Sequence, residues 1–177
     1  MQKISIVLVL GILGLIFHLG CDIGENSCSS INGTYQVNKT IRSVSCQKGV
    51  ASVKIQNARA ILPDSSKLTI TQTGCNLVAT ESIPGNNLFI PYTGDINSDD
   101  EFSLSVENPE QLAIPLELEI SGVKYTCRFN GSIDWDGEAS GDKLTGQIFY
   151  DLEKRADETE KACPSACQTN MDFSANK

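Results

Sequence analysis

The sequence predicts an all-β domain in which eight to ten antiparallel strands form either a closed barrel or a β-sandwich, stabilised by disulfides. Apolar and polar residues alternate over most of the chain from Ile31 onward, turn motifs separate the alternating stretches, and seven cysteines are present. Alternation puts successive side chains on opposite faces of a strand, which is typical of an antiparallel sheet with one wet face. A sheet of this size buries its apolar face by closing into a barrel or by folding into two packed layers.

The first twenty residues have the organisation of a signal peptide. A short positive region ends at Lys3, an apolar stretch covers 4–17, and Gly20 stands directly before Cys21. This order is typical of a leader that is removed on export. We therefore expect residues 1–20 to be a signal peptide, 21–30 a flexible tether of small polar residues, and 31–177 the folded domain.

The end of the leader resembles the lipobox of bacterial lipoproteins. In that family a small residue precedes a cysteine that receives diacylglycerol, and Gly20 and Cys21 match this pattern. The family usually has leucine three places before the cysteine, where this chain has His18; its leucine is one place late, at Leu19. The resemblance implies lipidation of Cys21 and a lipid anchor in the cell-envelope membrane. Free secretion and an uncleaved anchor are the alternatives.

The first half of the domain shows several short stretches of alternation. Turn motifs at 73–74, 84–87 and 98–100 lie between them. The apolar residues that mark the expected strands are Tyr35 and Val37, Val53 and Ile55, Leu68 and Ile70, Leu77 and Ala79, Leu88 and Ile90, and Phe102 and Leu104.

The second half alternates over longer runs, at 112–120, 123–135, 144–152 and 167–175. Pro115 has no N–H to donate, so its strand is expected at an edge or a bulge. The turn Ser140-Gly141-Asp142 joins two of these strands. Residues 151–161 are charged and contain alanine, and they predict one or two helical turns.

A second resemblance concerns the start of the domain. The run Ile31-Asn-Gly-Thr-Tyr35 is similar to the opening strand of lipocalin-like barrels, in which tryptophan occupies the position of Tyr35. The hairpins at 68–80 and 140–147 are similar to repeats of small exported bacterial β-domains of that kind. The resemblance favours a lipocalin-like barrel over a sandwich and implies no particular ligand.

Seven cysteines cannot all form disulfides with one another, so one of them must be free or modified. Lipidation of Cys21 would consume it and leave six disulfide candidates, for which 15 connectivities exist: Cys28, Cys46, Cys75, Cys127, Cys163 and Cys167. Cys127 and Cys167 share the apolar faces of their strands, which predicts a bridge between them. We expect Cys28 to fasten the start of the domain to a loop.

Charge and residue types restrict the chemistry. The formal net charge is −8, which disfavours nucleic acid as a partner. The one histidine, His18, lies in the leader, so the mature domain lacks the imidazole of Ser-His-Asp and Cys-His catalysis. We therefore predict no enzyme, no cofactor and no metal centre.

Two acidic clusters and four aromatic residues are the candidate sites. Asp95, Asn97 and Asp99 are weak calcium candidates because oxygen ligands alternate there, although the glycine and glutamate of a calcium loop are missing. The run 134–138 is also rich in carboxylates. The possible pocket-lining residues, all on apolar faces, are Tyr125, Phe129, Trp135 and Tyr150.

These observations favour a cell-envelope lipoprotein that acts as a non-catalytic binding or structural module, with its domain in the periplasm or at the cell surface. Its partner, a protein or a small apolar molecule, stays open. One alternative is a lipocalin-like carrier of a small apolar ligand. The other is a hydrolase that uses paired carboxylates.

Overall fold

The computed structural model describes residues 28–48, 53–54, 59–61, 64–85, 88–110, 112–120 and 122–177. The expected signal peptide and Cys21 lie outside these ranges. The eleven strands in the described ranges are β1 Gly33–Lys48, β2 Val53–Lys54, β3 Arg59–Ile61, β4 Ser65–Thr73, β5 Asn76–Ser82, β6 Phe89–Ile96, β7 Glu101–Val106, β8 Ile114–Ile120, β9 Val123–Ser140, β10 Lys143–Lys154 and β11 Ala166–Asn176.

Eight strands close into an antiparallel barrel. Their order around the ring is β10, β11, β1, β4, β5, β6, β7 and β9, and β9 pairs with β10 to close it. The predicted all-β barrel is thus confirmed, and closure excludes the sandwich. Closure also satisfies the backbone donors and acceptors that an open sheet would leave at its edges.

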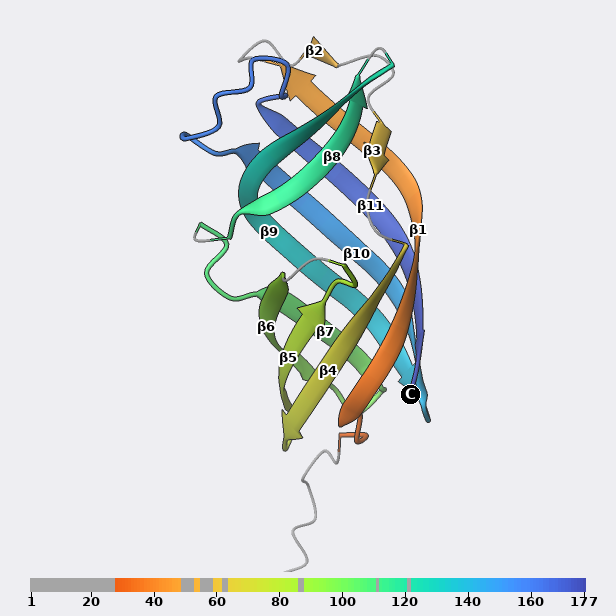
Figure 1. The fold of residues 1–177 in the computed structure, drawn as a ribbon. Coiled ribbons are helices and arrows are strands. Elements are labelled where there is room, and N and C mark those ends of the chain that lie inside the picture. Colours follow the sequence, from red (N-terminus) through yellow and green to blue (C-terminus); the bar gives the residue numbers. More distant parts are fainter. Residues whose placement is uncertain are drawn as a thin grey trace, which may run out of the picture.

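The barrel wall is much taller on one side than on the other (Figure 1). Strands β1, β9, β10 and β11 run from the lower end to the upper end, whereas β4 to β7 cover only the lower part. Above β7, the first half of β9 pairs instead with β8, and β8 pairs with β3. Pro115 is exposed and lies beyond the three residues of β8 that β3 reaches, as expected for a residue without an N–H.

The inward faces of the strands form one core. The predicted alternation is confirmed along β9, β10 and β11, where inward residues such as Phe129, Ile148 and Met171 are buried. Residues 151–154 continue β10 rather than forming a helix, because Leu152 extends the buried row of that strand. The described residues contain no helical turn at 155–161, so the expectation of a short helix was wrong.

Two strands approach unusually closely near the lower end of the wall. Gly137 of β9 faces Gly146 of β10. A Cβ atom added to Gly146 would lie 2.1 Å from the carbonyl oxygen of Asp136, so no larger residue fits without a backbone shift. Glycine is therefore required here for the two strands to meet as they do.

Candidate functional site

The four predicted aromatic residues do not gather at one place. Phe129, Trp135 and Tyr150 are buried inside the barrel, but Tyr125 is only partly buried, near the end of the hairpin formed by β8 and β9. Trp135 and Tyr150 border two buried charged residues that were not among the predicted site residues, Lys39 and Glu81.

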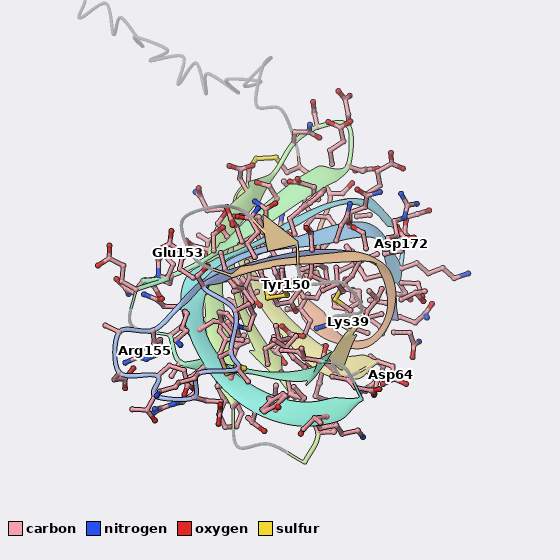
Figure 2. The ribbon with its side chains drawn as sticks, turned by 90° about the horizontal axis from the view of Figure 1, so that it is seen from above. Lys39, Asp64, Tyr150, Glu153, Arg155 and Asp172 are labelled. Carbon is pink, nitrogen blue, oxygen red and sulfur yellow. A yellow bond between two sulfur atoms is a disulfide. The ribbon has the colours of Figure 1, made fainter. Side chains whose placement is uncertain are left out.

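Lys39 and Glu81 form an ion pair inside the barrel. Only 1% of the Lys39 side chain and 0% of the Glu81 side chain are exposed, and Lys39 Nζ contacts Glu81 Oε1 directly. The Tyr92 hydroxyl donates a 2.9 Å hydrogen bond to Glu81 Oε2. Lys39 Nζ also lies 5.3 Å from the centre of the Trp135 ring. Seen from above, Lys39 and Tyr150 lie within the ring of strands (Figure 2).

Burial changes the acidity of the groups around this pair. Burial opposes the charge on Lys39, but the adjacent Tyr150 and Glu81 outweigh it and raise the pKa of the lysine. Burial, reinforced by the Glu81 carboxylate, raises the pKa of Tyr92 well above its ordinary value of 10.0. Burial likewise raises the pKa of Tyr150, which Lys39 partly offsets.

These tyrosines predict a loss of stability in alkali. A folded-state pKa above the unfolded value of 10.0 means that the unfolded chain releases its proton first as pH rises. Stability should thus be unaffected below pH 10 and fall above it by about 1 kcal/mol per pH unit for each of Tyr92 and Tyr150. Urea unfolding between pH 8 and pH 11 measures this. Tyr92→Phe should reduce the slope, and an unchanged slope would contradict the assignment.

Large side chains of the described strands occupy the lumen. The largest fully buried ones include Trp135, Tyr35, Tyr92 and Phe129. The ring of Trp135 contacts those of Tyr92 and Phe173 edge-on, with centroids 5.9 and 4.9 Å apart. A packed aromatic core of this kind gives no support to the alternative of an apolar-ligand carrier.

A hollow lies on the outer wall, across β6, β7, β9 and β10. Its volume is about 700 Å³. It is lined by Asp95, Asn97, Glu101, Phe102, Ser103, Asp136, Gly137, Glu138, Thr145, Gly146, Gln147 and Phe149. We call it the acidic hollow. The two acidic clusters of the sequence, at 95–101 and 134–138, meet here because β7 pairs with β9.

The acidic hollow contains carboxylates without a neutralising partner. Asp95, Glu101, Asp136 and Glu138 line it, and no lysine or arginine does. The ion pairs formed among the described residues all involve other carboxylates. Negative charge on one concave surface favours a ligand of positive charge.

Asn97, one of the calcium candidates, has a structural role in the turn between β6 and β7. The side-chain oxygen of Asn97 accepts 2.9 Å hydrogen bonds from the backbone N–H groups of Asp99 and Glu101. Its amide nitrogen donates to Glu101 Oε2 at 2.9 Å. In the ranges that the structure describes, no three Cys, His, Asp or Glu side chains lie close enough to hold a metal ion.

Three disulfides join the six candidate cysteines. The pairs are Cys28–Cys75, Cys46–Cys167 and Cys127–Cys163. The predicted Cys127–Cys167 bridge was wrong: β10 separates β9 from β11, and strands two places apart lie about 10 Å from each other. Cys46 faces Cys167 on the neighbouring strand, with their Cα atoms 4.1 Å apart.

The first disulfide fastens the start of the domain. Cys28, assigned to the tether from the sequence, is bonded to Cys75 in the turn between β4 and β5. The side chain of Gln72 adds a 3.0 Å hydrogen bond to the carbonyl oxygen of Ser29. Residues 28 and 29 are therefore attached to the β4–β5 end of the barrel, as expected for Cys28. Three disulfides in one domain indicate an oxidising, extracytoplasmic compartment.

Comparison with known proteins adds no relative: no family model matches the chain, and no curated protein matches it. Within the described part of the chain, no helix has the length and apolar character of a membrane span.

Proposed function

We propose that the chain is a cell-envelope lipoprotein, anchored through Cys21, whose barrel is a non-catalytic binding module for positively charged partners. The observation that carries the proposal is the acidic hollow, because it is concave, lined by four carboxylates and free of lysine and arginine. The packed lumen supports an outer-wall site over an internal one. A basic segment of another envelope protein has the charge to occupy the hollow.

Replacing two carboxylates of the acidic hollow should weaken such binding. In Asp136→Asn with Glu138→Gln, an oligolysine peptide should bind about fivefold more weakly, since each exposed charge pair contributes about 0.5 kcal/mol. Fluorescence anisotropy at low salt measures the affinity, which should also fall as salt screens the charges.

The matched control is Glu117→Gln with Glu119→Gln on β8, which removes the same charge outside the hollow. It should leave the affinity within the error of measurement. Equal losses in the two double variants, or binding of oligoglutamate as tight as that of oligolysine, would rule out the hollow as the site.

The anchor is tested separately. The full chain should enter the detergent phase in Triton X-114 partitioning, and Cys21→Ala should move to the aqueous phase, because acyl chains contribute about 0.8 kcal/mol per buried methylene. An unchanged distribution would refute the anchor and leave the binding experiment unaffected.

A further inference from the structure

We propose that the Lys39 side-chain nitrogen condenses with the Glu81 carboxyl group to form an amide bond inside the barrel. The two groups are in direct contact and are almost completely buried. They come from β1 and β5, which are separated by β4. The bond would thus join two strands that are not neighbours, on the inner face of the barrel.

Condensation would remove two buried charges, which are otherwise stabilised by the pairing of Lys39 with Glu81 and by the hydrogen bond from Tyr92. Burying an ammonium and a carboxylate costs more free energy than their attraction returns unless both are well paired. In water, hydration of the two ions opposes condensation, and a lumen packed with Trp135, Tyr92 and Phe173 withholds that hydration. An amide keeps the close contact and removes both charges.

Contact also removes most of the entropic barrier. Two reactants held in position by a folded scaffold behave as if present at an effective concentration of about 10⁵–10⁸ M. Lys39 is held by its strand, whose backbone N–H at this residue donates a 2.7 Å hydrogen bond to the carbonyl oxygen of Asp64. Glu81 is held by the hydrogen bond from Tyr92.

The reaction needs no other reactant. One proton passes from the Lys39 ammonium to Glu81 Oε1, which leaves a neutral amine beside a neutral acid. The nitrogen lone pair then attacks Cδ, the electrons of the carbonyl bond move to Oε2, and the Tyr92 hydroxyl stabilises the charge that develops there. When the carbonyl re-forms, the bond from Cδ to Oε1 breaks, and Oε1 leaves as water with a second proton from the nitrogen.

A digest of the exported full chain tests the link directly. After reduction, alkylation and cleavage with trypsin and chymotrypsin, mass spectrometry should find a branched peptide joining 36–42 to the segment of 78–89 that contains Glu81, lighter by one water than its parts. Trypsin cannot cleave after an acylated lysine. Recovery of only a linear peptide ending at Lys39 and an unmodified peptide containing Glu81 would overturn the proposal.

Variants identify the groups involved. Lys39→Arg keeps the positive charge but has no condensing amine, and its digest should contain no branched peptide. Tyr92→Phe should lower the linked fraction at a fixed time after synthesis. Lys67→Arg, at an exposed lysine on β4, is the control and should leave the linked fraction unchanged. A branched peptide of equal yield in Lys39→Arg would show that the bond lies elsewhere.

Discussion

Replacing both Cys46 and Cys167 with alanine is expected to lower the free energy of unfolding by about 5 kcal/mol. This disulfide joins residues 121 positions apart. Without it, the unfolded chain regains the conformational entropy of a long loop, which favours unfolding. Both cysteines are buried, and the two strands that they join, β1 and β11, belong to the tall side of the barrel wall. Urea unfolding of the double variant under oxidising conditions measures the change.

The control for this prediction is the double alanine variant at Cys127 and Cys163, which are 36 positions apart. Because the entropy of loop closure depends on the logarithm of loop length, its loss should be smaller by about 1 kcal/mol. A larger loss in the control would show that packing around the sulfurs, rather than loop length, determines the contribution of each bridge.

Trp135→Ala is expected to destabilise the barrel by about 4 kcal/mol, since it removes the largest buried side chain and leaves a cavity. The indole ring contacts Tyr92 and Phe173, and it covers the Lys39 ammonium. The midpoint of urea denaturation, compared with that of the unmodified chain, measures the effect.

Phe149→Ala on β10 is the matched aromatic control. Its ring lies on the outer face with 37% of the residue exposed, so we expect a loss below about 1 kcal/mol. Similar losses in the two variants would mean that the lumen around Trp135 collapses after truncation instead of remaining open.

Strand periodicity predicted most of the fold because a period of two is a local property. The rows of β9, β10 and β11 are buried as the alternation indicated, and the turn at 140–142 joins the strands expected. Disulfide pairing depends on which strands are neighbours, and alternation carries no information about neighbours. Cys127 and Cys167 share an inward orientation, yet a whole strand separates them.

The candidate sites also depend on which strands are neighbours, which strand alternation does not predict. The sequence identified the clusters at 95–101 and 134–138 separately, and the pairing of β7 with β9 brings them to one hollow. Lys39 and Glu81 were missed because charged residues in an alternating strand are usually assigned to the wet face. Lys39 does fall on the inward row of β1 with Val37, and Glu81 falls on that of β5 with Ala79, so the period of two was a signal that could have revealed both.

The disulfide between Cys28 and Cys75 has a consequence for how the domain would stand on a bilayer. Cys21 precedes Cys28 by seven residues, which span at most about 25 Å when fully extended. The β4–β5 turn, which contains Cys75, lies at the same end of the barrel as the β6–β7 and β9–β10 turns, and the acidic hollow lies next to these turns (Figure 1). In the proposed anchored state this end faces the lipid headgroups. Anionic lipids concentrate basic peptides at their surface, so the hollow would meet its partners where they accumulate.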